Sequence, residues 1–189
     1  MGLGYVGLPL ALEAARAGLQ VVGVDEDEAV VSGLNQGRSH VDDITDGEIS
    51  DVLVKDFVVT TDPSAVGGAD VVVICVPTPL DGNLGPNLHA VEEAARTIAH
   101  HLKPGLLVVL ESTTYPGTTE ELLIPLLEGS GLIAGQDFYV AYSPERIDPG
   151  NKEFTLRNTP KVVGGICPSS TNRAVEFYSR LVDEVVVSG

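Results

Sequence analysis

The sequence predicts an α/β domain with a mostly parallel sheet and helices on both faces, and three observations support that prediction. Apolar runs typical of buried strands alternate with helical runs along all 189 residues. A glycine-rich turn opens the chain, and the β-branched run at 70–76 is typical of a parallel strand buried on both faces. No linker or repeat interrupts this order, so a single domain is predicted over residues 1–189.

The glycine turn consists of Met1 followed by GLGYVG, which fits the pattern G-x-G-x-x-G. In a doubly wound, Rossmann-like fold this pattern forms the strand-to-helix turn that holds the pyrophosphate of a dinucleotide. Gly2 would make the tight turn, Gly4 would let the backbone approach the pyrophosphate, and Gly7 would let the helix lie close to the sheet. Glycine-rich turns are common, so the pattern needs support from its context.

An acidic residue provides that support. The helical run LPLALEAARAGLQ ends near Gly18, and a short strand at 21–24 leads to Asp25. Asp25 follows the turn by about the 20 residues expected for the carboxylate that binds the adenosine ribose. A carboxylate there would repel a 2′-phosphate, so NAD is favoured over NADP as the cofactor. The alternative role for Asp25 is that of a helix N-cap.

The strand that should precede the glycine turn is missing, because only Met1 stands before Gly2. In the strand order 3-2-1-4-5-6 that strand lies in the middle of the sheet, buried on both faces and hydrogen-bonded along both edges. We therefore expect the first, central strand to be truncated and the chain to be a fragment of a longer protein.

The remaining elements continue the alternation. A helix is predicted at 26–37, an acidic segment at 38–56 with a short helix near 47–54, a strand at 57–60 and a helical turn from Asp62. Strands at 70–76, 106–110, 138–141, 161–165 and 184–187 alternate with helices at 88–102, 117–127 and 170–181. Ligands bind beyond the carboxyl ends of strands in such sheets, which indicates 76–78, 112–113 and 143–145 as the functional edge.

Charge and composition exclude several classes of partner. The 27 acidic and 11 basic residues give a net charge of −16, which disfavours nucleic acid or an anionic membrane as a partner. No transmembrane run or signal peptide is recognisable in the sequence. Two cysteines are too few for a disulfide framework and indicate a reducing compartment, with the cytoplasm as the default. His100 and His101 have no second ligand nearby, so no metal site is predicted.

Six segments resemble the amino-terminal half of the UDP-glucose/GDP-mannose dehydrogenase family. They are GLGYVGLPLA, VGVD, VVVICVPTPL, ESTTYPGTTEELL, YSPERIDPGN and PKVVGG, in the family's order and across nearly the whole chain. YSPERIDPGN is most similar to the branch acting on UDP-N-acetylated hexosamines, of the UDP-N-acetylglucosamine 6-dehydrogenase type. The resemblance implies an NAD-dependent oxidoreductase that converts the C6 alcohol of a UDP-sugar to a carboxylate with two NAD. It also implies a homodimer for the full-length protein only.

The resemblance assigns roles to individual residues. The pyrophosphate would be held by Gly2, Gly4, Tyr5, Val6 and Gly7, the adenosine ribose by Asp25, and the rest of the cofactor would be lined by Val76, Pro77 and Thr78. Thr113 matches a strand-end threonine near the reacting centre, and Glu145 matches the glutamate that positions or activates water in the hydrolytic step. Without the resemblance, Thr113 would be interpreted as an N-cap or strand-end hydrogen-bonding group, and Glu145 as a solvated loop carboxylate.

The chain departs from the family pattern in several places. Val30 stands where many members have a basic residue near the adenosine, and Pro149 replaces a second acidic residue of the UDP-glucose enzymes, which counts against UDP-glucose. The family's catalytic cysteine, which carries the aldehyde as a thiohemiacetal, and its UDP-binding domain would lie beyond this chain. The chain as given should therefore not turn over. Cys167 lacks the Lys-Asp that should follow a catalytic cysteine, and we interpret it as structural; Cys75, inside a buried strand, is interpreted as inert packing.

Two other functions stay open at this point. A stand-alone dinucleotide-binding or redox-sensing module needs no further domain, but it gives no reason for Thr113 and Glu145 to share one edge. A simple two-electron dehydrogenase, such as a hydroxy-acid enzyme, has the same fold. It would need a proton-relay lysine or histidine, which the sequence does not place.

Overall fold

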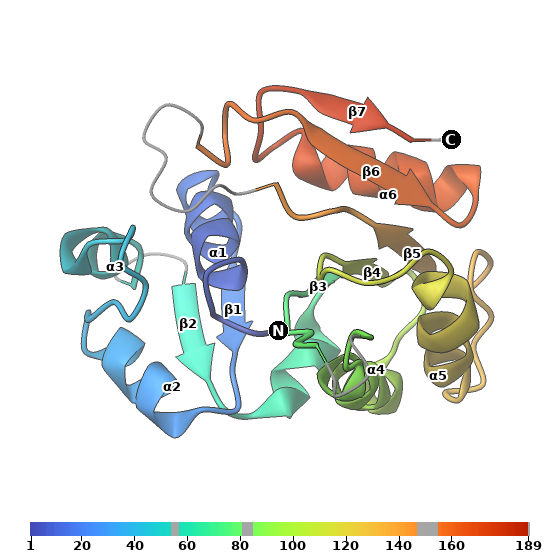
Figure 1. The fold of residues 1–189 in the computed structure, drawn as a ribbon, viewed down its shortest axis with the longest axis horizontal. Helices are drawn as coiled ribbons and strands as arrows, with labels where there is room; N and C mark the ends of the chain where they lie inside the picture. Colours follow the sequence, from blue (N-terminus) through green and yellow to red (C-terminus); the bar gives the residue numbers. More distant parts are fainter. Residues whose placement is uncertain (54–56, 81–84, 147–154, 189) are drawn as a thin grey trace.

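The computed structural model describes residues 1–53, 57–80, 85–146 and 155–188 (Figure 1). The helices are α1 (Gly7–Arg16), α2 (Glu28–Asn35), α3 (Asp46–Leu53), the 3-10 helix η1 (Pro63–Gly68), α4 (His89–His101), the π-helical turn η2 (Thr119–Leu123), α5 (Ile124–Glu128) and α6 (Pro168–Tyr178). The strands are β1 (Val21–Val24), β2 (Phe57–Thr60), β3 (Val71–Ile74), β4 (Leu107–Leu110), β5 (Tyr139–Tyr142), β6 (Lys161–Gly165) and β7 (Val185–Val187). The predicted alternation of strand and helix is therefore confirmed.

The strands form two sheets. One pairs β1 with β2, and the other has the order β3-β4-β5-β6-β7. Every pair is parallel except β5–β6, in which Ala141 lies opposite Gly165 and Tyr142 opposite Gly164. The described parts of the β5–β6 connection contain no helix, and a parallel crossover needs a connection that packs across the sheet.

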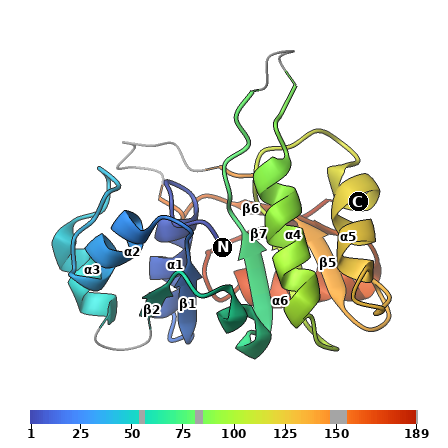
Figure 2. The same ribbon diagram turned by 90° about the horizontal axis from the view of Figure 1, so that it is seen from below.

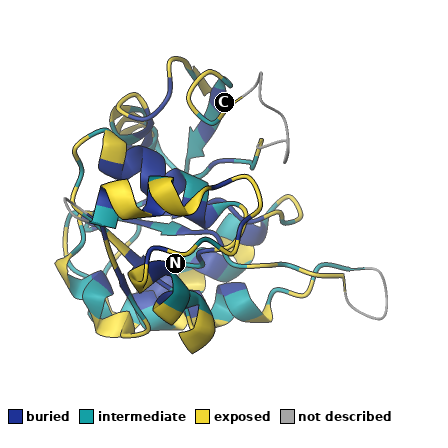
Figure 3. Cartoon of the chain, turned by 90° about the vertical axis from the view of Figure 1, so that its left-hand side faces the viewer, coloured by how far each residue is buried: buried dark blue, intermediate teal, exposed yellow. Residues whose placement is uncertain are grey.

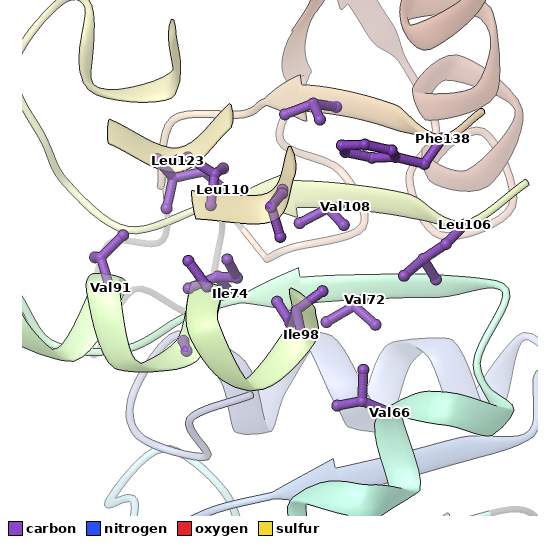
Figure 4. Close-up of a cluster of buried hydrophobic side chains, with 14 residues drawn as sticks. Val66, Val72, Ile74, Val91, Ile98, Leu106, Val108, Leu110, Leu123 and Phe138 are labelled. Carbon is purple, nitrogen blue, oxygen red and sulfur yellow. The ribbon is translucent and has the colours of Figure 1, made fainter. Parts of the chain in front are cut away.

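The larger sheet has helices on both faces, as predicted for a doubly wound fold. Alternate residues of β3 and β4 point to opposite sides, because side chains alternate along a strand. Figure 4 shows Ile74, Val108 and Leu110 facing α4 and η2, where Val91, Ile98, Leu123 and Phe138 complete the cluster. On the other face Leu107, Val109 and Ala141 pack against α1 and α6 through Leu10, Ala14, Ala174 and Tyr178.

The smaller sheet is covered mainly on one face. Helices α1, α2 and α3 pack over it through a cluster that includes Leu8, Leu12, Leu34, Ile49 and Phe57. In Figure 2 these helices gather around β1 and β2, and Figure 3 shows exposed residues on the outer sides of the helices. On the opposite face of the sheet, Val22 and Val58 remain 47% and 60% exposed.

Met1 and Gly2 connect the two sheets. The Met1 ammonium group donates to the Val73 carbonyl at 2.7 Å, and the Cys75 N–H donates to the Met1 carbonyl at 2.8 Å. On the other side the Gly2 N–H donates to the Val24 carbonyl at 2.8 Å. Figure 1 shows the amino terminus between β1 and β3, so the start of the chain occupies the carboxyl end of a central strand position.

Candidate functional site

The glycine turn is shaped by close contacts with the end of β3. Gly2 has φ +85°, and a Cβ at this position would lie 2.8 Å from the Cys75 carbonyl oxygen. A Cβ at Gly7 would lie 1.8 Å from the Gly2 carbonyl oxygen, so only glycine allows α1 to begin this close to the turn. A Cβ at Gly4 would meet nothing within 4 Å. Gly2 and Gly7 are therefore required by the fold, whereas the space beside Gly4 is open to a ligand.

Asp25 lies directly beside this turn. Its Oδ2 accepts the Leu3 N–H at 2.7 Å, and its Oδ1 accepts the Asp27 N–H at 3.0 Å. The N-cap of α2 is Asp27, whose Oδ1 accepts the Ala29 N–H at 2.8 Å, so the N-cap alternative for Asp25 is wrong. The structure brings the predicted ribose-binding carboxylate to the turn, with its position fixed by backbone donors.

A neighbouring loop that the sequence analysis did not single out also contacts the turn. Tyr5, which is 48% exposed, donates its hydroxyl to Asp42 Oδ2 at 3.2 Å, and this hydrogen bond raises the pKa of Tyr5. His40 Nε2 lies 2.9 Å from the Leu3 carbonyl oxygen. These contacts join residues far apart in the sequence, and the acidic, irregular segment around them contains no local signal that would predict them.

The ends of β3 and β4 are held together by hydroxyl groups. Ser112 Oγ donates to the Val76 carbonyl at 2.7 Å, and Thr78 Oγ1 donates to the Thr113 carbonyl at 2.5 Å. The structure therefore brings the predicted residues Val76, Thr78 and Thr113 to one edge, with Pro77 exposed between the first two. Thr113 is itself exposed, and the N-cap of η2 is Thr118, so Thr113 does not cap that helix.

Glu145 follows β5 at the same edge. Ser143 connects β5 to its neighbours, because its N–H donates to the Leu110 carbonyl at 3.0 Å and its hydroxyl to the Val162 carbonyl at 2.9 Å. Glu145 is half-buried: its Oε1 accepts the Arg146 N–H at 2.6 Å, and its Oε2 is shielded from solvent. The Glu145 charge contributes to the raised pKa of Cys75. Glu145 is thus a loop carboxylate that is only partly exposed to solvent.

A buried ion pair lies under this edge and was missed by the sequence analysis. Lys161 Nζ contacts Glu111 Oε1, and these residues are only 3% and 0% exposed. Tyr178, also buried, donates to Glu111 Oε2 at 3.0 Å, and its ring centroid lies 5.4 Å from Lys161 Nζ. Burial lowers the pKa of Lys161 to about 8, while the Glu111 carboxylate favours the charged lysine.

Lys161 lies near the carboxyl end of β5 because β6 runs antiparallel to β5. In a wholly parallel sheet the first residue of β6 would lie at the opposite edge, far from Glu145. Lys161 is enclosed and paired with Glu111, whereas a proton relay must reach its substrate, so it does not supply the base that a hydroxy-acid dehydrogenase would need.

The two cysteines lie in different environments. Cys75 is 9% exposed, and burial raises the pKa of its thiol to about 11. Cys167 stands at the N-cap of α6, where the Ser170 hydroxyl at 3.4 Å lowers its pKa. The Ile166 N–H donates to the Val140 carbonyl, which places Cys167 toward the amino end of β5 and away from Glu145.

Several other features have no role at this edge. Among the described residues, no group of three or more His, Cys, Asp or Glu side chains could hold a metal ion. No helix in the described ranges is both long and apolar enough to cross a membrane. Val30 lies in α2 and packs against the cluster of the smaller sheet, and Pro149 falls outside the described residues.

Comparisons with known proteins identify the family. Residues 1–182 match the family model described as the NAD binding domain of the UDP-glucose/GDP-mannose dehydrogenase family. The UDP-N-acetyl-D-mannosamine dehydrogenase of Pyrococcus horikoshii is 39% identical over 96% of this chain and 44% of its own length. The UDP-N-acetyl-D-glucosamine 6-dehydrogenase of Pseudomonas aeruginosa is 37% identical over 100% of this chain and 43% of its own length.

Solved structures agree with these relatives. A structure of the Pyrococcus horikoshii UDP-D-ManNAc dehydrogenase superimposes with a TM-score of 0.94 at 38% identity, covering 100% of this chain and 46% of the other. The chain thus spans less than half the length of the curated relatives that it matches. The resemblance found in the sequence and the expectation of NAD as cofactor are confirmed: the chain belongs to the UDP-glucose/GDP-mannose dehydrogenase family and corresponds to its NAD binding domain.

Proposed function

We propose that this chain is the NAD-binding part of a nucleotide-sugar 6-dehydrogenase that oxidises the C6 alcohol of a UDP-N-acetylhexosamine to the carboxylate. The observation that supports it most is the arrangement at the turn: open space beside Gly4, with the Asp25 carboxylate held next to it by the Leu3 N–H. This combination fits a diphosphate flanked by a ribose, because backbone N–H groups bind phosphate and a carboxylate accepts from ribose hydroxyls.

The remaining roles follow the same edge of the sheet. Backbone groups at Gly4, Tyr5 and Val6 bind the diphosphate, and Val76, Pro77 and Thr78 line the rest of the cofactor. NAD supplies the hydride acceptor for the alcohol carbon when it is bound. Thr113, fixed through its carbonyl by Thr78, presents an exposed side chain to the reacting end of the site.

Glu145 is the residue that we assign to the water step. Its carboxylate stands at the end of β5, partly enclosed and oriented by the Arg146 N–H, so it can hold a water molecule and accept its proton. The hydrolytic step that forms the acid needs such a base, whereas a single oxidation to the aldehyde does not.

The substrate class rests on the relatives and on one residue. The two relatives described above are named for UDP-N-acetyl-D-mannosamine and UDP-N-acetyl-D-glucosamine. Pro149 stands where UDP-glucose enzymes carry a second acidic residue, which disfavours UDP-glucose. The proposal therefore covers both N-acetylhexosamines, within a complete enzyme that acts as a cytoplasmic homodimer.

Calorimetric titration with NAD tests the cofactor site. A valine at Gly4 meets open space in the protein, so Gly4→Val should leave the melting temperature unchanged and reduce NAD affinity at least tenfold. Gly47→Val is the matched control, because its Cβ also meets open space (Thr45 Oγ1 is 3.9 Å away) on the distant helix α3. Equal NAD affinity in the two variants, or no heat with the parent chain, would refute the proposed cofactor site.

The reaction is tested separately in a fusion to the carboxyl-terminal half of the Pyrococcus horikoshii relative. UDP-N-acetylglucosamine, UDP-N-acetylmannosamine, UDP-glucose and GDP-mannose should be compared as substrates. We expect two NADH per N-acetylated sugar and a carboxylate product, and Glu145→Gln should slow the formation of acid. One NADH per sugar with accumulation of aldehyde would contradict the proposed reaction without contradicting NAD binding.

A further inference from the structure

His40 contacts a peptide group in the first half of the glycine turn. Its Nε2 atom lies 2.9 Å from the Leu3 carbonyl oxygen. A carbonyl oxygen can only accept a hydrogen bond, so Nε2 carries the proton and donates it. The Leu3 N–H, which belongs to the preceding peptide group, donates to Asp25 Oδ2 at 2.7 Å. Two side chains from different segments therefore hold two consecutive peptide groups of the turn.

The peptide group that His40 contacts also contains the Gly4 N–H. This peptide group is planar and trans, so the Leu3 C=O and the Gly4 N–H point in opposite directions. The hydrogen bond from His40 thus directs the Gly4 N–H away from the His40 ring. The space beside Gly4 is open, because a Cβ there would meet nothing within 4 Å. The direction of a donor next to this open space is therefore set by a side chain 37 positions from Leu3.

The loop that carries His40 is anchored in the core of the smaller sheet. Val41 and Ile44 are 2% and 8% exposed and belong to the cluster under α1, α2 and α3. The Ser39 N–H donates to Asp46 Oδ1 at 2.8 Å, and the Ser39 hydroxyl accepts the Val41 N–H at 3.1 Å. His40 itself is exposed. The neighbours of His40 hold the loop in place, so its own side chain is not needed to fill the core.

The same loop makes a second contact with the turn. Asp42 Oδ2 accepts the hydroxyl of Tyr5, the residue after Gly4, at 3.2 Å. Asp42 and Tyr5 are both exposed, so water can replace this hydrogen bond at little cost. The hydrogen bond between His40 and Leu3 is partly buried and acts on the backbone directly. Of the two contacts, the one made by His40 should have the larger effect on the turn.

We propose that His40 is a positioning residue for the cofactor: by donating to the Leu3 carbonyl, it orients the Gly4 N–H toward the diphosphate of NAD. This inference rests on the proposed cofactor site. A donor that is already oriented loses less conformational freedom when the ligand binds. Removing the hydrogen bond from His40 should therefore weaken NAD binding, although His40 acts only through the peptide group between Leu3 and Gly4.

The test compares NAD affinity by calorimetry with thermal stability in three variants of the chain. His40→Met removes the donor and should weaken NAD binding about threefold to tenfold. His40→Gln keeps an N–H near the position of Nε2 and should restore most of that affinity. Both variants should melt within about 2 °C of the parent, because His40 is exposed. His100→Met is the matched control: His100 is exposed near the end of α4, which leads to the start of β4 at the opposite edge of the sheet.

ADP serves as a second ligand, because it contains the diphosphate but no nicotinamide. His40→Met should weaken the binding of ADP and of NAD by the same factor, and His100→Met should weaken neither. The inference is overturned if His40→Met binds NAD like the parent, if His40→Gln binds as weakly as His40→Met, or if the loss is confined to NAD. A larger fall in the melting temperature of His40→Met would assign this residue to the fold instead. Each of these results leaves the cofactor site intact, whereas no heat from NAD with the parent chain would refute the site and this inference together.

Discussion

The glycine turn and the Glu111–Lys161 pair lie at the same edge of the sheet but are built in opposite ways. The turn is made of backbone groups, and Gly4 at its centre is exposed with open space beside it. The pair is made of charged side chains that are at most 3% exposed. A ligand can approach the first region without disturbing the core, whereas the second cannot exchange partners unless the core opens. A charged side chain at this edge of the sheet is therefore not necessarily accessible to a ligand.

The largest expected effect tests whether the Glu111–Lys161 ion pair stabilises the packing of β4, β6 and α6. Lys161→Met leaves the Glu111 carboxylate buried without its counter-ion and should lower the free energy of unfolding by about 3–5 kcal/mol. The double variant Lys161→Met/Glu111→Leu removes both charges and should recover most of that loss. Urea denaturation of the two variants and the parent measures both values. A single variant as stable as the parent would show that the pair does not hold β4, β6 and α6 together.

The two cysteines allow the reactivity of a buried side chain to be compared with that of an accessible one. Burial raises the pKa of Cys75 to about 11, whereas the Ser170 hydroxyl lowers that of Cys167. At pH 7.5 iodoacetamide should therefore modify Cys167 at least about 100-fold faster than Cys75, because the thiolate is the reactive form. Between pH 7 and 9 the rate at Cys75 should rise about tenfold per pH unit, since that range lies wholly below its pKa. Peptide mass spectrometry over time measures both rates, and similar rates would mean that the region around Cys75 is open.

Gly7→Ala tests the close approach of α1 to the turn. The added methyl group would overlap the Gly2 carbonyl oxygen, so the variant should lose about 1–3 kcal/mol of stability and also bind NAD more weakly. Gly4→Val, by contrast, should affect NAD alone. Thermal unfolding with and without NAD separates the two effects. If the two variants lose the same amounts of stability and of NAD affinity, then Gly7 is not required mainly for folding and Gly4 mainly for NAD binding, as we infer.

The smallest expected effect concerns α3, which packs against α1. Thr45 and Glu48 form a capping box: the Thr45 N–H donates to Glu48 Oε2 at 2.9 Å, and the Glu48 N–H donates to Thr45 Oγ1 at 3.3 Å. Thr45→Ala should cost about 1 kcal/mol of unfolding free energy at pH 7. The Thr45 backbone hydrogen bond lowers the pKa of Glu48, so the stability from this carboxylate is present above its unfolded pKa and is lost as pH falls through its folded pKa. An unchanged value for Thr45→Ala in urea denaturation would contradict this account.

The sequence was most informative where the requirement is local. Gly2, Gly7 and Asp25 were recognised because a left-handed turn, a close helix contact and a strand-end carboxylate each demand particular residue types at fixed spacing. Lys161 was missed because its position depends on the direction of β6, which is a property of strand pairing. His40 and Asp42 were missed because their contacts with Leu3 and Tyr5 join segments that share no periodic pattern.

The amino-acid sequence by itself determined the α/β class, the glycine turn, the choice of NAD and the family, because each follows from short-range patterns of residue size, charge and backbone freedom. Only the tertiary structure decided that β6 is reversed and that Glu111 and Lys161 are buried together. The physical reason is that these features arise from hydrogen bonds and packing between distant segments. Such contacts depend on which strands become neighbours, and no single stretch of sequence specifies that.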